Sequence, residues 1–310
     1  MSRAYDGQMD LRQLEYFAAV ARHRHFTRAA DELYVTQSAL SQQVRRLEEE
    51  LGLALLLRTS RGVELTPAGT DLLARAESIL GEVERARTDM DEHAGVSRGL
   101  VRVAATTGDA LRLPRALATF HAEHPGIRIG LRQGSSGEVV ELVRRGAADL
   151  AVIGTLPSDG PGLESVVVAE EPLCVACARD DPLAGAGGVA FADLRGRSLI
   201  LAEPDSPLRR SVARACADAG FSPVPLFEVS DPWTVRFLTA AGLGLSVVPS
   251  SWLDLPGPPV VRLELTGAAP LHQVSLLVPA AAGGGSPAAA LLHEHLSREL
   301  GSDARASDDG

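Results

Sequence analysis

Hydrogen-bonding side chains recur between residues 36 and 46 at spacings that place them on one side of a helix. That side holds Ser38, Ser41, Gln42, Arg45 and Arg46, with Gln37 in the first turn and Thr36 immediately before it. The other side carries an apolar stripe made of Leu40, Val44, Leu47 and Leu51. Gln can bond adenine with two hydrogen bonds, Ser can bond either base type, and Arg can bond guanine or phosphate. The stretch therefore predicts a helix whose polar face reads base edges in a DNA major groove.

Two potential side-chain caps divide this region into separate helices. Thr27 can accept a hydrogen bond from the free N–H groups of a helix over residues 28–33, and Thr36 can do the same for the polar-faced helix. The free N–H groups at a helix start also favour a DNA phosphate. Three acidic side chains at 48–50 would be repelled by DNA, so the far end of the polar-faced helix must leave the groove.

A pair of short strands follows the polar-faced helix. Residues 55–58 and 63–65 have strand character on either side of a turn, and together they predict a wing. Arg58 and Arg61 can reach phosphates or the minor groove from that wing. The alternative is a plain helical hairpin with a solvated polar face. The ordered series of cap, turn, polar-faced helix and Arg-bearing wing favours a winged helix-turn-helix.

Five short motifs add a family resemblance. They are Phe17-Ala-Ala-Val-Ala21, Phe26-Thr-Arg-Ala-Ala30, Thr36-Gln-Ser-Ala-Leu-Ser41, Leu47-Glu-Glu-Glu-Leu-Gly52 and Leu65-Thr-Pro-Ala-Gly69. Together they closely resemble the N-terminal signature of LysR-type transcriptional regulators. Leu57 departs from the Phe that is usual in the family, and we expect only a small packing change under the wing. The resemblance implies a DNA-binding domain over residues 9–66, completed by a first helix that Asp10 can cap. The buried stripe of that helix is predicted to be Leu11, Leu14, Phe17, Ala18 and Ala21.

Charge and composition bound the class of protein. The chain has 310 residues, a formal net charge of −10, 45% hydrophobic and 23% charged residues, which suits a globular protein of two or three domains. Residues 11–65 hold eight Arg against seven Asp or Glu, a local balance of +1. Local placement of Arg, and not net charge, must therefore supply phosphate contacts. A polar N-terminus and the lack of a long apolar run predict a cytoplasmic protein with no membrane partner.

A long helix is predicted over residues 67–94. Thr66 can cap it, and Pro67 stands at its first position. Its apolar residues recur at steps of three and four and include Leu72, Leu73, Ala76, Ile79, Leu80 and Val83. Such a stripe calls for a partner, and a second copy is the simplest one. Packing of the helix on its own domain is the alternative. The resemblance implies the linker and dimerisation helix of the family, whose symmetric dimer presents two recognition helices.

A second composition begins after residue 94, with short β-branched runs that alternate with helical segments, typical of an α/β sheet. Strands are predicted at 100–104, 127–131, 150–153, 166–168, 173–178, 198–201, 226–229, 245–248 and 273–278, and helices at 113–124, 137–145, 206–219, 232–241 and 288–300. This order resembles the two-lobe effector domain of the family, similar to periplasmic binding proteins. The resemblance implies an effector-binding domain over 95–300, with lobe 1 at 95–168 and 269–300 and lobe 2 at 169–268. The polar composition of 301–310 predicts a mobile tail.

Polar residues follow the carboxyl ends of the predicted strands, where open α/β sheets bind ligands. They are Thr106, Thr107, Ser135, Ser136, Thr155, Glu203, Ser206 and Ser230, and Pro249 ends a stretch that resembles the family. Hydroxyls and free helix N–H groups favour a carboxylate or other anion. Each Ser or Thr could instead be a simple helix cap. Glu203 is unusual for an anion site and would favour a cationic or hydroxyl-rich effector, so both ligand classes stay open.

Other chemistries lack their motifs. Cys174 and Cys177 stand in a strand-like run that points them to opposite faces, which disfavours a metal or dithiol site. In the peroxide-sensing branch of the family a cysteine pair lies in the effector domain. Here Pro207 occupies the first position and Cys216 the second, which disfavours a thiol switch. The sequence has no nucleophile elbow, P-loop, dinucleotide fingerprint or zinc motif. We expect no enzyme activity, catalytic residue, metal or cofactor.

The sequence therefore predicts a LysR-type transcriptional regulator. Its partners would be double-stranded promoter DNA, a small-molecule effector that the sequence does not identify, and further copies of itself. The resemblance implies a dimer and a dimer of dimers, a tetramer that bends DNA. A ligand-binding protein of the periplasmic type and an enzyme that uses the cleft are the alternatives.

Overall fold

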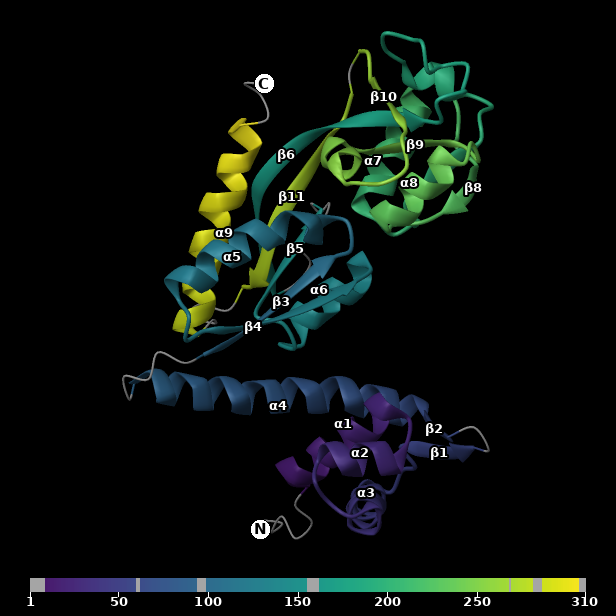
Figure 1. Ribbon diagram of the computed structural model, residues 1–310. Helices are drawn as coiled ribbons and strands as arrows, with labels where there is room; N and C mark the ends of the chain where they lie inside the picture. The colour runs from purple at the N-terminus through teal and green to yellow at the C-terminus, as the bar shows by residue number, and fades with distance from the viewer. Residues whose placement is uncertain are drawn as a thin grey trace. The chain divides into compact units, whose positions relative to one another are not determined.

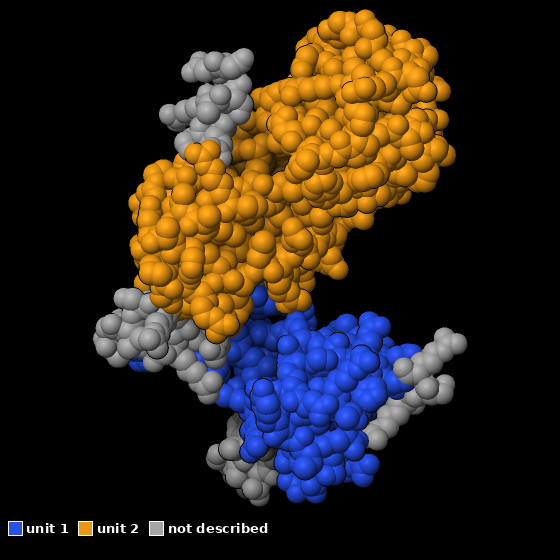
Figure 2. Space-filling view, viewed as in Figure 1, with its two compact units in different colours: residues 1–93, 145–147 blue, residues 94–144, 148–310 orange. Residues whose placement is uncertain are grey.

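The computed structural model describes residues 9–59, 62–93, 99–154, 162–267, 269–280 and 286–306. The chain divides into two compact units, 1–93 with 145–147 and 94–144 with 148–310, coloured blue and orange in Figure 2. The first unit is mostly helical, and the second is built around a large mixed sheet (Figure 1). Predicted Thr155 and Arg61 lie outside the described residues.

Three helices form the head of the first unit: α1 (Leu11–His23), α2 (Phe26–Glu32) and α3 (Gln37–Leu51). Asp10 caps α1 as predicted, because its carboxylate accepts from the Gln13 N–H while the Gln13 side chain accepts from the Asp10 N–H. Apolar side chains from all three helices meet in one buried core, which includes Phe17, Phe26, Ala29, Leu40, Val44 and Leu47. Leu11 is an exception to the predicted stripe, because it is 43% exposed at the first position of α1.

The cap predicted for α2 is wrong. The helix begins two residues earlier, at Phe26, and His25 is its N-cap residue, with its ring accepting from the Thr27 N–H at 3.2 Å. Thr27 therefore lies inside the helix, where its side chain cannot serve as the cap. His25 is an uncommon cap, which explains why a search for Ser, Thr, Asp or Asn passed over it.

A wing and a long helix complete the first unit. Strands β1 (Leu56–Thr59) and β2 (Gly62–Leu65) pair antiparallel, and α4 spans Pro67–His93. Thr66 caps α4 as predicted, since its hydroxyl oxygen accepts from the Gly69 N–H at 2.9 Å. A Cβ on Gly69 would lie 2.1 Å from the Leu55 carbonyl oxygen, so only glycine lets the helix start against the wing.

The second unit contains a nine-stranded sheet. Eight strands lie in the order β4-β3-β5-β11-β6-β9-β7-β8, and β10 pairs with β6. Their bounds are β3 Leu100–Thr106, β4 Arg128–Gly134, β5 Leu150–Gly154, β6 Leu163–Cys177, β7 Leu199–Leu201, β8 Pro225–Glu228, β9 Leu245–Pro249, β10 Val261–Glu264 and β11 Leu271–Pro279. Parallel pairs flank the antiparallel centre, where β11 runs beside β6 and β5. Figure 1 shows β6 and β11 side by side, running from one group of elements to the other.

Helices cover the sheet in two groups, each with its own core. The helices are α5 (Leu113–Glu123), α6 (Ser136–Arg144), α7 (Pro207–Asp218), α8 (Pro232–Ala240) and α9 (Pro287–Ala306), and three 3₁₀ helices are η1 (Asp109–Arg112), η2 (Phe191–Leu194) and η3 (Ser250–Asp254). One core joins residues from 101–169 to residues from 274–300. The fully buried residues of the other core come from 173–263, and half-buried Leu111 and Leu265 are among the residues that pack against it. We use the names lobe 1 and lobe 2 for the elements around these two cores, and strands β6 and β11 run from one to the other.

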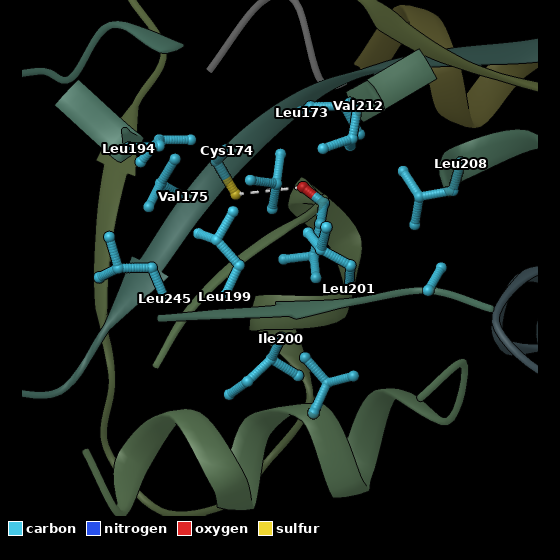
Figure 3. Close-up of a cluster of buried hydrophobic side chains, with 14 of the residues drawn as sticks. Leu173, Cys174, Val175, Leu194, Leu199, Ile200, Leu201, Leu208, Val212 and Leu245 are labelled. Atoms are coloured by element: carbon cyan, nitrogen blue, oxygen red, sulfur yellow. Dashed lines mark hydrogen bonds between the residues drawn. The ribbon is translucent and has the colours of Figure 1, made fainter. Parts of the chain in front are cut away.

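The lobe 2 core accounts for all three cysteines. Cys174, Cys177 and Cys216 are fully buried in this core, and Figure 3 shows the Cys174 side chain among leucines and valines. Its thiol donates to the Val248 carbonyl oxygen at 3.6 Å. Burial raises the pKa of the Cys174 thiol to about 12 and that of the Cys216 thiol to about 11. The thiols therefore stay protonated and serve as small apolar groups.

Three elements differ from the sequence-based expectation. The runs predicted at 166–168 and 173–178 belong to one continuous strand, β6, which is 15 residues long. Strand β10 was not predicted, because its four residues mix Val and Leu with Arg and Glu. Helix α9 continues to Ala306, into the segment predicted as a mobile tail. For β6 and β10 the neighbouring strands, and not the local pattern, decide the extent of the element.

Candidate DNA-reading face and effector cleft

The polar side of α3 faces solvent. Thr36, Gln37, Ser38, Gln42 and Arg45 are all exposed, and we call these five residues the reading face. Thr36 is the N-cap residue, with its hydroxyl oxygen accepting from the Ala39 N–H at 3.2 Å. The Ser38 hydroxyl lies 3.2 Å from that of Thr36. The structure thus presents hydroxyl, amide and guanidinium groups on one helix side, held by an apolar stripe at Leu40, Val44 and Leu47 that is fully buried.

Three predicted DNA contacts, Ser41, Arg58 and Arg61, are not part of the reading face. Ser41 is half-buried and not fully exposed. Arg58 belongs to β1, and Arg61 lies outside the described residues. The contacts predicted between these two side chains and DNA therefore stay predictions. Leu57 does not pack under the wing as predicted, because its side chain is 50% exposed. Alternation along β1 buries Leu56 and turns Leu57 outward.

The acidic end of α3 has a structural role. The Glu48 carboxylate accepts from the backbone N–H groups of Leu55 and Leu56, at 2.8 and 3.1 Å. These bonds fix the start of the wing to the end of α3. The negative charge of Glu48 is therefore used inside the domain, at the end of the helix remote from the reading face.

The apolar stripe of α4 divides between two environments. Leu72 and Leu73 pack against the core of the head, and Ala76 is buried. Ile79 is 38% exposed, while Leu80 and Val83 are half-buried. The first turns of α4 therefore belong to the DNA-binding head, as the packing alternative predicts.

A cleft opens in the second unit between the two lobes. Seven of the predicted effector residues line it: Thr106, Thr107, Ser135, Ser136, Glu203, Ser206 and Ser230. They come from the ends of β3, β4, β7 and β8, as the carboxyl-end rule predicts. Thr155 lies outside the described residues, although its neighbour Gly154 lines the cleft. Pro249 is buried at the end of β9 and does not line it.

The lobes approach each other closely across this cleft. A Cβ on Gly108 would lie 2.2 Å from the ring of Trp252, which belongs to η3 of lobe 2. A Cβ on Gly137, in the first turn of α6, would lie 3.7 Å from the Asp205 carboxylate of lobe 2. The free volume of the cleft is about 40 Å³, room for roughly three water molecules.

A buried ion pair, which the sequence analysis did not predict, lies at the base of the cleft. Asp109 and His272 are 6% and 8% exposed, and the His272 Nε2 lies 2.8 Å from the Asp109 Oδ1. Burial alone would raise the pKa of the Asp109 carboxyl, but His272, Thr106 and the Gly154 N–H outweigh it and lower that pKa. Burial alone would lower the pKa of His272, but the charge and hydrogen bond of Asp109 raise it. Both groups are therefore charged, and each stabilises the other.

A second ion pair lies beside the first and links the lobes. Glu171 on β6 pairs with Arg112 of η1 in lobe 1. The same carboxylate accepts from the Ser251 N–H at 2.9 Å and from the hydroxyls of Ser250 and Ser251 in η3 of lobe 2. Glu171 is also the register partner of His272, where β6 pairs with β11. The four charges of the two pairs sum to zero, and each carboxylate is hydrogen-bonded, as a buried site requires.

No local pattern could have identified these four residues. Asp109 and His272 are separated by 163 positions in the sequence, and neither belongs to a motif. The nearest approach to a local signal is an Asp three residues after the end of β3, within Thr106-Thr-Gly-Asp109. In the described part of the chain, no cluster of three or more His, Cys, Asp or Glu could hold a metal ion. None of the described helices is long and apolar enough to cross a membrane.

Comparison with known proteins identifies both units. Residues 11–70 match the bacterial regulatory helix-turn-helix protein, lysR family, and residues 94–301 match the LysR substrate binding domain. The chain belongs to the LysR family. LysR proteins are transcriptional regulators and not enzymes, so this chain is a DNA-binding transcriptional regulator with an effector-binding domain.

Named relatives and solved structures agree with the LysR assignment. The transcriptional dual regulator GltC of Bacillus subtilis (strain 168) is 34% identical over 244 residues, 78% of this chain and 81% of that protein. ShiR of Corynebacterium glutamicum (strain R) is 35% identical over 261 residues, 83% and 88% of the two chains. The crystal structure of the LysR family regulator CbnR is 28% identical, with a TM-score of 0.73 over 94% of this chain and 99% of CbnR. Full-length CbnR in complex with its target DNA is 29% identical, with a TM-score of 0.72 over 94% and 100%.

Proposed function

We propose that the reading face of α3 binds operator DNA in the major groove and supplies the sequence specificity of this regulator. The observation that carries the proposal is the contrast along one helix: a fully buried apolar side and an exposed side of Thr, Gln, Ser and Arg. The N-terminus of α3 adds free N–H groups for a phosphate. Arg58 and Arg61 of the wing are proposed to contact phosphates or the minor groove beside it. The similarity to CbnR, solved with its target DNA, supports this mode of binding.

The working state that we propose is a dimer joined along α4, and a dimer of dimers on promoter DNA. The exposed Ile79 and the half-buried Leu80 and Val83 are the stripe residues left beyond the turns that pack on the head. A symmetric pair of reading faces would match two half-sites of a palindromic operator. We propose the cytoplasm as its location, because promoter DNA is its target.

The proposed effector site is the cleft between the lobes. A ligand that contacts hydroxyls from both lobes has a different affinity for each lobe arrangement, and that difference shifts the state of the regulator. Thr107 and Ser136 lie on the lobe 1 side, and Ser206 and Ser230 lie on the lobe 2 side. Thr155 and Pro249 stay predictions that the geometry does not support further.

One relative suggests another signal. The hydrogen peroxide-inducible genes activator of Dickeya chrysanthemi is 34% identical over 244 residues. We infer that this chain does not respond through a thiol, because Cys216 is fully buried and its pKa is raised to about 11. In the native protein, iodoacetamide should leave Cys216 unlabelled at neutral pH and label it in urea. Labelling of the folded chain would contradict this inference.

A mobility-shift assay tests the central proposal. The full chain is expected to shift the DNA upstream of its own gene, and Ser38→Ala with Gln42→Ala should abolish that shift while the protein stays folded. Glu49→Ala with Glu50→Ala is the matched control, because both residues are exposed at the other end of α3. Unchanged DNA binding by the first double variant would refute the assignment of the reading face.

A ligand screen tests the effector site. Thermal shift of the full chain against a metabolite library should identify compounds that stabilise the effector domain. With such a compound, Thr107→Val with Ser136→Ala should remove the change in DNA binding and leave basal DNA binding intact. A full response by that double variant would move the effector site away from the cleft.

A further inference from the structure

Among the described residues, one ring nitrogen of His272 has no hydrogen-bond partner. Its Nε2 is bonded to Asp109, but its Nδ1 has no hydrogen-bond partner among the residues that the structure describes. The ring lines the cleft and lies beside Gly154, where a Cβ would come within 3.2 Å of the His272 Cε1 and 3.3 Å of Pro207. The cleft is therefore the place from which a partner for Nδ1 can come.

The charges that surround the ring keep it protonated. Asp109 and Arg112 reach it from η1, and Glu171 reaches it from β6. From lobe 2 the charged residues that line the cleft are Glu203 and Asp205, and both are exposed to water. Asp109 and Glu171 together raise the pKa of His272 against the effects of burial and Arg112. A protonated imidazole donates from both nitrogens, so Nδ1–H is a charged donor.

A second polar group in the same cleft, the Ser136 hydroxyl, is also without a partner among the residues that the structure describes. Ser136 opens α6 and is 8% exposed, and its hydroxyl makes no hydrogen bond to any described residue. Its neighbour Ser135 is already bonded to Glu138, so the two serines differ. The helix start at Ser136 adds free N–H groups. A nearly buried hydroxyl and a charged imidazole donor thus line one small space.

Size and charge limit what this space can hold. A free volume of about 40 Å³ corresponds to three or four non-hydrogen atoms, at roughly 10–15 Å³ for each water-sized site. The Nδ1–H of the imidazolium can only donate and the Ser136 hydroxyl can donate as well as accept, so a ligand that carries acceptors is complementary to both. Glu203, which left a cationic ligand open, is exposed to water and does not set the charge at the base of the cleft.

We propose that His272 is a ligand-contacting residue of the cleft and that its imidazolium binds a small carboxylate, or the carboxylate group of a larger effector. Asp109 and Glu171 are positioning residues that hold the ring and its charge. This inference rests on the proposed effector site, because it assigns a ligand class and a contact to the same cleft. Ligand affinity is then linked to pH: it is full while His272 is protonated and falls as the pH rises through its raised pKa.

Thermal melting of the full chain with acetate tests the proposal. Both tryptophans of the chain, Trp233 and Trp252, lie in the effector domain, so their fluorescence reports the melting of that domain alone. Acetate is compared with chloride at equal ionic strength from about pH 6 to about pH 10, a range that begins below the ordinary His pKa of about 6.5. Acetate is expected to raise the midpoint at low pH, and this gain should vanish at high pH.

Two variants distinguish a direct contact between His272 and acetate from a general effect on stability. In Asp109→Asn with His272→Gln, which keeps a hydrogen-bonding pair without charge, the apparent affinity for acetate should fall at least tenfold and lose its pH dependence. His121→Gln, at an exposed position of α5, should behave like the unchanged protein. An equal gain in the paired variant, a pH-independent gain in the unchanged protein, or no gain with acetate or formate would each overturn the proposal. Operator binding is measured separately by mobility shift, so failure of the regulator proposal would be seen independently.

Discussion

The reading face and the interlobe cleft use polar side chains in opposite ways. On α3 the Ser, Gln and Arg groups are exposed, so water satisfies them until DNA replaces it. In the cleft, Asp109, His272 and Glu171 are buried and bonded to each other or to both lobes. Removing one group from the reading face costs the fold little, whereas removing one from the cleft leaves a partner charge buried. In the head, the side chains that we propose to read DNA are therefore largely separate from those that stabilise the fold. In the effector domain, the charged side chains of the cleft also stabilise the fold.

The largest effect is expected at the buried ion pair. Asp109→Ala leaves the His272 imidazolium without its partner and should lower the free energy of unfolding of the effector domain by about 3–5 kcal/mol. Urea unfolding followed by tryptophan fluorescence measures this loss. The paired variant Asp109→Asn with His272→Gln should recover much of it, because neither group is then charged. A loss below about 0.5 kcal/mol in Asp109→Ala, the level of an ordinary surface substitution, would contradict the claim that the buried ion pair stabilises the effector domain.

The reading face should show the reverse pattern. Ser38→Ala with Gln42→Ala should weaken operator binding at least tenfold, since each lost base contact contributes about 1–3 kcal/mol of discrimination. The unfolding free energy of the head should change by less than about 0.5 kcal/mol per site. Fluorescence anisotropy with operator DNA measures the affinity, and circular dichroism melts measure the stability of the head. A large loss of stability would show that these side chains are structural.

A smaller effect concerns pH. The raised pKa of His272 contributes stability that is full below its unfolded value of about 6.5 and is lost as the pH rises through the folded value. The lowered pKa of Asp109 contributes stability above about pH 3.9 that is lost as the pH falls through the folded value. The stability difference between the unchanged protein and the paired variant should therefore be largest between about pH 4 and pH 6.5. A difference that grows towards high pH would show the opposite sign and contradict the ion pair.

The smallest effect is expected at Thr36. This residue of the reading face resembles the cleft residues, because one side chain is expected to serve both stability and binding. Its hydroxyl caps α3 and also belongs to the reading face. Thr36→Ala should cost about 1 kcal/mol of head stability and weaken DNA binding as well. Thr36→Ser keeps the capping oxygen and should restore the stability. Calorimetry and anisotropy on both variants would show whether the Thr36 hydroxyl oxygen both caps α3 and contacts DNA.

Local pattern explains which features the sequence could predict. Caps at Asp10, Thr36 and Thr66 each depend on residues within a few positions, and the structure confirms them. The apolar stripe of α3 is confirmed from Leu40 to Leu47, but Leu51, predicted in the same stripe, is 38% exposed at the end of the helix. Of the nine predicted effector residues, the structure places seven in one cleft, and the carboxyl-end rule predicted these seven because the ends of strands along the chain can be read from the sequence. Whether these residues bind an effector stays a prediction.

By itself the sequence determined the head, the order of the α/β elements and the ring of hydroxyls around the cleft, since periodicity, caps and strand ends are short-range properties. Only the tertiary structure decided that Asp109 and His272, 163 positions apart, form a buried pair beside Glu171 and Arg112. It also decided that β6 is continuous and that Leu57 faces outward. The physical reason is that the charge state and burial of a side chain depend on what packs around it, and those neighbours come from distant parts of the chain.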